Sequence, residues 1–211
     1  MDDFPRCRVA TWEEIDRWAD RLAEKIVAVG HRPQTIVGLT RGGWVPSRLL
    51  ADRLGTKRLV ALRAQHWGVT ATPAGKAELT EGLSGDVRGE ELLVADDITD
   101  TGESLELATQ HLLGHHPKRV ESATFLHITH SKFRPTYYAE EISRDAWVWV
   151  VFPWNYWEDL ATLGRKALDS AGSVAAARRL LKEKTGWEPS LADLGRALEG
   201  AGSAVPPAAP P

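Results

Sequence analysis

The chain has 211 residues, which at about 150 residues per domain corresponds to one full domain plus an appendage. Its 26 Lys and Arg against 29 Asp and Glu give a net charge of −3, which argues against binding nucleic acid or an anionic membrane over the whole surface. The single cysteine, Cys7, can form neither an intramolecular disulfide nor a cysteine-based zinc site. Because no apolar run approaches the roughly 18 residues of a membrane helix and no targeting segment is visible, we expect a cytoplasmic globular protein.

The first third of the chain alternates helical and strand patterns. A Thr-x-x-Glu capping box at Thr11 opens an amphipathic pattern that ends at Gly30, which predicts a first helix. The short apolar run 35–39 precedes an Arg-Gly-Gly turn and predicts a buried parallel strand. A helical stripe over 45–54 and an apolar run over 59–62 follow. Two such β-α repeats predict a parallel sheet.

The irregular segment 65–88 interrupts this alternation, and irregular segments of that length in compact domains are usually functional loops. The alternation then resumes with a helix predicted at 102–113 and strands at 92–95, 120–126 and 147–152. The total of about five strands with helices between most of them predicts an α/β fold, an open, doubly wound and mostly parallel sheet.

The pattern after Pro153 is helical only. Short amphipathic helices are predicted at 157–168, 174–184 and 191–198. Residues 201–211 are rich in Ala and Pro and carry no charged side chain, so we expect a flexible tail there.

The segment 92–105 carries the clearest chemical signal. An apolar strand leads to Asp96 and Asp97, and a Thr-Gly-x-Ser turn at 101–104 then opens a helix. The N-terminus of a helix presents free N–H groups, and the two hydroxyls add donors, so the turn predicts a phosphate site. The carboxylates suit ribose hydroxyls or a hydrated Mg²⁺, and a sugar phosphate satisfies both requirements. Receiver domains also have an Asp pair after a strand, but near the start of the chain and without this turn.

This segment resembles the signature of the type I phosphoribosyltransferases, which bind 5-phosphoribosyl-1-diphosphate. By this resemblance, Asp96 and Asp97 hold the ribose 2′- and 3′-hydroxyls and contribute, mostly through water, to a Mg²⁺ site. Asp100 stands where the 6-oxopurine enzymes have the residue that handles the purine N7 proton. Glu103 departs from the family, where Lys is frequent, so its backbone is expected to bind while its side chain points outward. The implied cradle of the 5′-phosphate consists of Thr101, Gly102, Glu103 and Ser104.

A second glycine-rich element follows the first predicted strand. In Thr40-Arg41-Gly42-Gly43 the glycines allow close approach of the backbone to a ligand, and Arg41 offers a forked donor for diphosphate oxygens. Alone, this string is better explained as a glycine-rich turn with a solvated arginine. Beside the Asp pair, residues 36–46 resemble the diphosphate loop of xanthine and hypoxanthine-guanine enzymes, with Thr40 replacing their Ser. The resemblance implies a cis peptide bond before Arg41 and a catalytic role for Arg41 on the departing diphosphate.

The resemblance assigns two further segments to the purine base. The family's Lys-Pro-Asp stretch brings a cation to the base O6, and this chain has Arg134-Pro135-Thr136 there with Lys132 two residues earlier, so either cation is expected to do this. Trp154 is expected to stack on the ring, with packing as the alternative, and the backbone at Phe152 to read the base edge. Both segments follow predicted strands and are expected at the sheet edge that carries Asp96 and Asp97.

Residues 65–80 stand where relatives have a mobile loop that closes over the reaction centre and excludes water. The candidates there for contacting ligand are His66, Trp67 and Lys76. Of the nine tryptophans, three fall in predicted ligand loops and six, Trp147 among them, are interpreted as packing. The histidines at 111–116 and at 127–130 are not interpreted as metal sites, because no carboxylate or cysteine completes a ligand set.

The resemblance covers about residues 11–159. It predicts a phosphoribosyltransferase domain at 1–160 with a small hood, a helical extension at 161–200 and a tail at 201–211. The implied activity is Mg²⁺-dependent transfer of 5-phosphoribosyl to N9 of a 6-oxopurine in purine salvage, by a homo-oligomer, dimer or tetramer. A regulator that senses the donor without turnover, and a transferase for orotate, uracil or adenine, stay open as alternatives.

Overall fold

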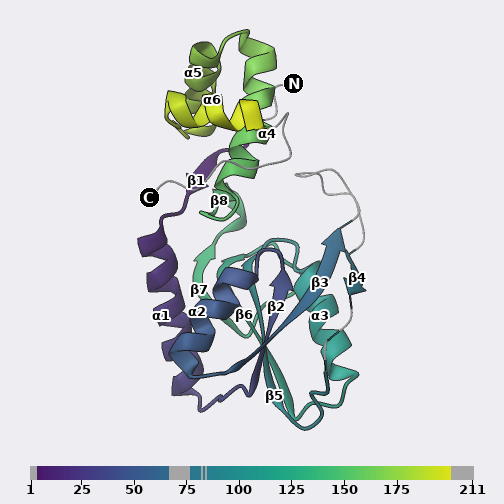
Figure 1. Cartoon of the computed structure of the whole chain (residues 1–211). Coiled ribbons are helices and arrows are strands. Elements are labelled where there is room, and N and C mark those ends of the chain that lie inside the picture. Colours follow the sequence, from purple (N-terminus) through teal and green to yellow (C-terminus); the bar gives the residue numbers. More distant parts are fainter. Residues whose placement is uncertain (1–3, 67–76, 82, 84, 201–211) are drawn as a thin grey trace. The chain divides into compact units, whose positions relative to one another are not determined.

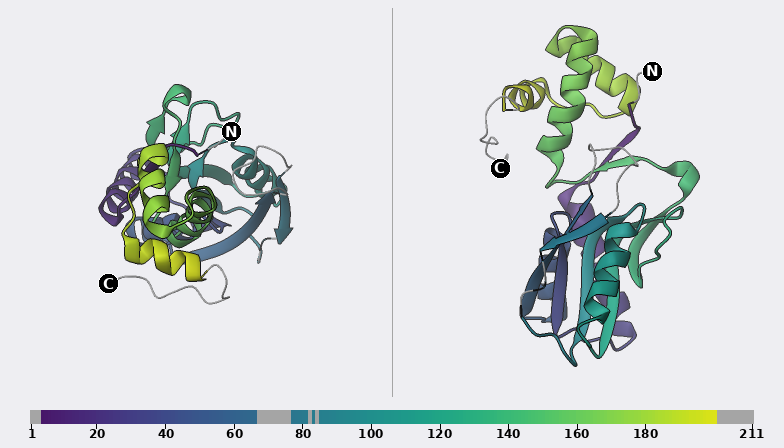
Figure 2. Two further views of the ribbon diagram at one scale, coloured as in Figure 1. Left: turned by 90° about the horizontal axis from the view of Figure 1, so that it is seen from above. Right: turned by 90° about the vertical axis from the view of Figure 1, so that its right-hand side faces the viewer.

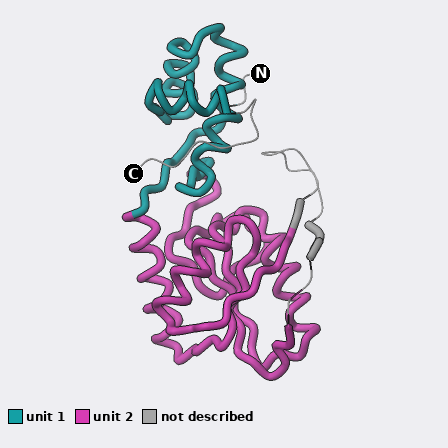
Figure 3. The backbone as a smooth tube through the Cα atoms, in the orientation of Figure 1, with its two compact units in different colours: residues 1–12, 148–211 teal, residues 13–147 magenta. Residues whose placement is uncertain are grey.

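The computed structural model describes residues 4–66, 77–81, 83 and 85–200. The chain forms two compact units, one made of Glu13–Trp147 and the other of Met1–Trp12 with Val148–Pro211 (Figure 3). Among the described helices, none has the length and apolarity needed to cross a membrane.

The larger unit is built on a six-stranded sheet (Figure 1). Five neighbouring strands are parallel, and β4 at one edge runs antiparallel to β3. In spatial order the strands are β4(Ala77–Glu81), β3(Arg58–His66), β2(Thr35–Thr40), β5(Glu91–Thr99), β6(Arg119–Ile128) and β7(Tyr137–Ile142).

Helices cover both faces of this sheet, as Figures 1 and 2 show. Helix α3(Glu103–Leu113) packs on the face that carries Val37 of β2 and Val94 of β5. The opposite face carries α1(Trp12–Ala28) and α2(Trp44–Leu54), which are joined by ion pairs from Arg53 to two aspartates of α1. The central strands are apolar on both faces because both faces are covered.

The order of the strands places a topological switch between β2 and β5. The chain leaves β2 through α2 to reach β3 on one side, and it leaves β5 through α3 to reach β6 on the other side. Pairing of β2 with β5 ends at Gly38 and Ala95, whereas β5 continues beside β6 as far as Thr99. In open α/β sheets, ligands bind at the carboxyl ends of strands at such a point.

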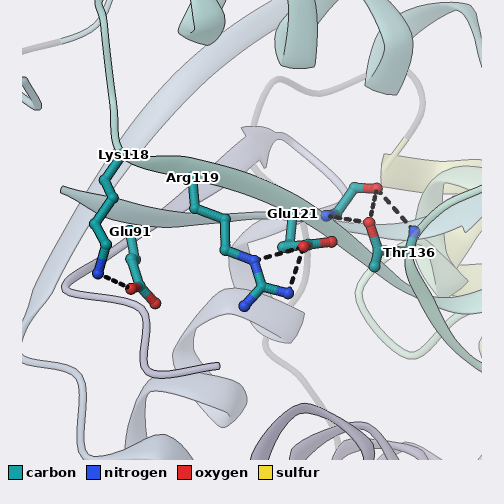
Figure 4. Close-up of polar contacts among 6 residues, drawn as sticks. Glu91, Lys118, Arg119, Glu121 and Thr136 are labelled. Atoms are coloured by element: carbon teal, nitrogen blue, oxygen red, sulfur yellow. Dashed lines mark hydrogen bonds and ion pairs between the residues drawn. The ribbon is translucent and has the colours of Figure 1, made fainter. Parts of the chain in front are cut away.

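Polar contacts gather at the opposite, amino-terminal end of the sheet (Figure 4). Lys118 Nζ lies 2.6 Å from Glu91 Oε1, and Arg119 pairs with Glu121 of its own strand at 2.6 Å. The hydroxyl of Thr136 accepts a hydrogen bond from the Ser122 backbone N–H at 3.2 Å, and the Thr136 N–H donates to the Ser122 hydroxyl at 3.0 Å. The two bonds between Ser122 and Thr136 fix the segment that enters β7.

The smaller unit has its own core. Strands β1(Cys7–Val9) and β8(Trp149–Val151) form a parallel pair. Helices α4(Tyr156–Ala171), α5(Val174–Thr185) and α6(Leu191–Gly200) pack on one another around a buried apolar cluster. Left-handed glycines end α4 and α5, a backbone conformation that residues with a side chain rarely adopt.

The predicted helices are confirmed, and so are the strands expected at 35–39, 59–62, 92–95 and 120–126. The expectation that 147–152 is the fifth strand of the main sheet is wrong. The fifth parallel strand is β7, whereas β8 pairs with β1 in a separate sheet. β7 has the sequence YYAEEI and lies at an edge, where polar residues are tolerated and obscure the strand pattern. The domain division at residue 160 stays a prediction, and α4 runs through this position.

Candidate active site

The turn at the start of α3 is shaped by one glycine. Gly102 has φ +86, and a Cβ there would lie 2.4 Å from Ser131 Oγ and 2.9 Å from the Phe133 backbone nitrogen. Both the conformation and the close approach therefore require glycine. The N–H of Glu103 donates weakly to Thr101 Oγ1, at 3.4 Å. The turn brings the positive end of the α3 dipole to the carboxyl edge of the sheet, an arrangement suited to an anion.

Two carboxylates lie side by side just before this turn. Asp96 and Asp97 are both in β5, beyond the point where β2 stops pairing with it. Asp97 is buried, and its backbone N–H donates to Asp96 Oδ1 at 3.0 Å. Burial, and after it the charge of Asp97, raises the pKa of Asp96 well above its ordinary value. A buried pair of like charges favours a ligand that donates hydrogen bonds or carries positive charge.

The loop after β2 lies directly against this pair. The peptide bond between Thr40 and Arg41 is cis, as the resemblance implies. A Cβ on Gly42 would lie 2.5 Å from Asp97 Oδ2, and one on Gly43 would lie 2.2 Å from the carbonyl oxygen of Ala95. The glycines thus let the β2 loop approach β5, and two motifs more than fifty residues apart in the sequence meet at one point.

The loop after β6 contacts the turn between β5 and α3 at successive positions. The N–H of Lys132 donates to the carbonyl oxygen of Thr101 at 3.2 Å. Phe133 packs on the apolar cluster that includes α3, which anchors the loop. The side chains of His130 and Asp100 form a third contact, with Nε2 of His130 2.7 Å from Oδ1 of Asp100. The same Asp100 oxygen accepts a hydrogen bond from Trp147 Nε1 at 3.3 Å.

Three loops of the larger unit therefore meet at the carboxyl end of the sheet, at its switch point. Residues 9–159 match the model of the phosphoribosyl transferase domain family. The chain belongs to this family. Its sheet of parallel strands between helices is the type I phosphoribosyltransferase fold that the sequence predicted.

Named members of the family with similar sequences are xanthine-guanine phosphoribosyltransferases. The protein from Desulfotalea psychrophila is 26% identical over 156 residues, which cover 73% of this chain and 89% of the relative. The protein from Cereibacter sphaeroides is 28% identical over 151 residues, covering 69% and 84%. Among solved structures, a purine phosphoribosyltransferase from Pyrococcus horikoshii superposes with a TM-score of 0.60 at 27% identity, over 73% of this chain and 94% of that one.

Within this phosphoribosyl transferase domain, the two cations proposed for the base lie in different surroundings. Arg134 contacts the hydroxyl of Tyr138, stacks over its ring with 5.2 Å to the centroid, and lies 3.4 Å from Glu141. Lys132 is exposed beside Thr101, and its ammonium group has no partner among the residues that the structure describes. The geometry favours Lys132 as the cation available to a ligand.

Residues 152–154, the second segment that the resemblance assigns to the base, do not follow a strand of the main sheet as predicted. Phe152 and Trp154 follow β8 and belong to the smaller unit, so the expectation that they follow a strand of the main sheet is wrong. Their rings stack on each other with centroids 4.9 Å apart and planes 9° apart, and Trp12 lies 6.0 Å from Trp154. The Phe152 ring is buried and its carbonyl oxygen accepts a hydrogen bond from the Asn155 N–H at 3.0 Å, whereas Trp154 is half-buried.

His130 and Trp147 are contacts of Asp100 that the sequence pattern did not indicate. Trp147 was expected to pack, yet its ring is partly exposed and its N–H is bonded to a carboxylate. No local signal predicts these pairs, because each joins segments at least thirty residues apart. Of the candidates at 65–80, Trp67 and Lys76 and the side chain of His66 lie outside the described residues.

Proposed function

We propose that the chain transfers the 5-phosphoribosyl group from 5-phosphoribosyl-1-diphosphate to N9 of a 6-oxopurine, with release of diphosphate. The products are a nucleoside 5′-monophosphate and diphosphate, and the role is purine salvage in the cytoplasm. The supporting observation is the contact of the Gly42 loop with Asp97 at the switch point of the sheet. It brings a phosphate turn, a carboxylate pair and an arginine loop together, as a substrate with phosphate, ribose and diphosphate parts requires.

Each part of the donor corresponds to one element. The 5′-phosphate binds the turn Thr101–Ser104, where the α3 dipole and hydroxyl donors stabilise its charge. Asp96 and Asp97 accept hydrogen bonds from the ribose hydroxyls. Thr40–Gly43 binds the diphosphate, and the guanidinium of Arg41 stabilises the charge that develops as this group departs.

The carboxylate pair also fits a divalent cation. Mg²⁺ usually keeps several waters and takes only one or two protein carboxylates together with substrate phosphates, and Asp96 and Asp97 supply two. Burial, and after it the charge of Asp97, raises the pKa of Asp96, and a cation held between the two carboxylates would offset both effects. Within the described ranges, no group of three His, Cys, Asp or Glu side chains forms a closed metal cage. When bound, Mg²⁺ neutralises charge on the donor's diphosphate and ribose oxygens.

For the base, we propose the roles that the resemblance assigns to residues of this chain. Asp100 acts as the general base that takes or shares the purine N7 proton, while Lys132 donates to the base O6. Trp154 stacks on the purine ring, and the backbone at Phe152 reads the base edge. The names of the two xanthine-guanine relatives support a 6-oxopurine, and that of the purine enzyme supports a purine.

The test is incubation with the donor, Mg²⁺ and each of xanthine, hypoxanthine, guanine, adenine, uracil and orotate, with diphosphate release measured. We expect release with at least one 6-oxopurine. Release only with another base would assign a different acceptor, and donor binding without release from any base would favour the regulator. Asp100→Asn should lower turnover by about 10² to 10⁴-fold with little change in donor affinity. Unchanged turnover would exclude the role of Asp100.

We also propose that residues 1–160 form the catalytic domain, that 161–200 are a helical extension, and that the protein is a homo-oligomer. Light scattering coupled to gel filtration should show a dimer or a tetramer. A monomer at working concentration would contradict the proposed homo-oligomer.

A further inference from the structure

The carboxylate of Asp100 is held asymmetrically. Its Oδ1 lies 2.7 Å from His130 Nε2 and accepts a hydrogen bond from Trp147 Nε1 at 3.3 Å. Its Oδ2 has no partner among the residues that the structure describes. Oδ1 therefore faces two nitrogen atoms, Nε2 of His130 and Nε1 of Trp147, and Oδ2 remains available to accept a proton.

The two donors come from separate parts of the fold. Asp100 follows β5, His130 lies in the loop after β6, and Trp147 follows the short 3-10 helix η1(Arg144–Ala146). The backbone around His130 is itself fixed, since the N–H of Ser131 donates to the carbonyl oxygen of Ile128 at 3.0 Å and Phe133 packs on the core. A rigid loop thus presents the imidazole to the carboxylate.

We propose that His130 is a positioning residue that orients the carboxylate of Asp100 for proton transfer. This inference rests on the proposed function, in which Asp100 is the general base. A free aspartate carboxylate rotates readily about χ2. A donor fixed on Oδ1 limits this rotation and keeps Oδ2 in one place, as efficient proton transfer requires. Trp147 is the second, weaker donor, because its bond is longer.

The substitution pair His130→Gln and His130→Leu tests this role. The amide nitrogen of Gln can occupy the position of Nε2 and donate to Oδ1, whereas Leu fills similar space without a donor. For His130→Leu we expect kcat to fall about tenfold or more, while KM for the donor changes less than twofold. His130→Gln should recover most of the lost kcat. His115→Leu, just after α3 and exposed, is the control for removal of a histidine.

A double-mutant comparison tests whether His130 acts through Asp100. In an Asp100→Asn background, His130→Leu should have almost no further effect on kcat, because the residue that it positions is already disabled. An equal loss in both backgrounds would overturn the proposal. So would a kcat for His130→Leu within twofold of the unaltered protein, or a His130→Gln variant as slow as His130→Leu.

A measurement without turnover separates this inference from the proposed function. In a long-range ¹H–¹⁵N spectrum of protein labelled at histidine, we expect His130 to carry a proton on Nε2, with resonances that shift in Asp100→Asn. Unchanged His130 resonances would overturn the pairing even in an active enzyme. If the unaltered protein transfers to none of the six bases, the proposed function and the role in transfer fail together, and the spectrum still decides whether the pair exists.

Discussion

The substitutions Gly42→Ala and Gly43→Ala should affect different properties, although the residues are adjacent. The first should lower activity, and the second should lower stability. Neither glycine has a positive φ, so an alanine is compatible with the backbone conformation at both positions. The difference lies in what the new methyl group meets. At Gly42 its nearest atoms are the carboxylate atoms of Asp97, at 2.5 to 2.7 Å. At Gly43 they are the backbone oxygen of Ala95, at 2.2 Å, and two backbone atoms of Leu39, at 2.7 Å.

The magnitudes follow from these distances. Real Cβ atoms essentially never approach closer than 3.0 Å, so at Gly42 the Asp97 carboxylate must move by at least 3.0 − 2.5 = 0.5 Å. A side chain can do this at little cost in stability, but a displacement of about 1 Å at a reacting centre costs about a hundredfold in rate. We therefore expect Gly42→Ala to lower kcat/KM for the donor about ten- to a hundredfold, with nearly unchanged stability.

At Gly43 no side chain can move to relieve the overlap. The methyl group needs at least 3.0 − 2.2 = 0.8 Å more space between backbone segments of β2 and β5. Overpacking of this kind typically costs about 1–3 kcal/mol, and more where the backbone is rigid. Gly43→Ala should thus lower the free energy of unfolding by at least that amount.

The assays are urea denaturation followed by circular dichroism, donor binding by calorimetry, and diphosphate release. Gly195→Ala is the control, because a methyl group in this helix meets nothing within 4 Å and should raise stability by about 0.5–1 kcal/mol. The reasoning is refuted if Gly42→Ala binds and turns over the donor within twofold of the unaltered protein, or if Gly43→Ala is as stable as it.

Three further predictions concern other parts of the larger unit. Lys132→Ala should raise KM for the base more than Arg134→Ala, because Arg134 is already engaged by Tyr138; equal effects in steady-state kinetics would contradict this. Gly102→Ala should lower the melting temperature more than Gly89→Ala, since both have positive φ, which alone costs about 1–2 kcal/mol, but only Gly102 is closely packed. Burial, and after it the charge of Arg119, lowers the pKa of buried His31 below its ordinary value, so the unfolded state binds more protons below about pH 6.5. Stability should therefore fall as the pH drops from about 6.5 toward the folded pKa, by up to about 1.4 kcal/mol per pH unit, and urea denaturation of His31→Phe should show a shallower dependence.

Local patterns in the sequence were sufficient for much of the larger unit. Strand β5 and helix α3 follow from an apolar run, a Thr-Gly-x-Ser turn and a helical stripe, all set by neighbours in the chain. The cis bond before Arg41 was also expected, from the resemblance of that loop. The edge strands were not, because β7 mixes exposed and buried residues without a clear period.

The sequence by itself predicted candidate residues for the chemistry and determined the helices and most strands of the main sheet, since both depend on residue type and spacing along the chain. Only the tertiary structure decided that β2 and β5 are neighbours, that Gly42 lies against Asp97, and that β8 leaves the main sheet for β1. It alone placed His130 and Trp147 on one oxygen of Asp100. The physical reason is that strand pairing and side-chain contacts between distant segments depend on how whole faces pack, and the periodicity of any one segment carries no information about its partner.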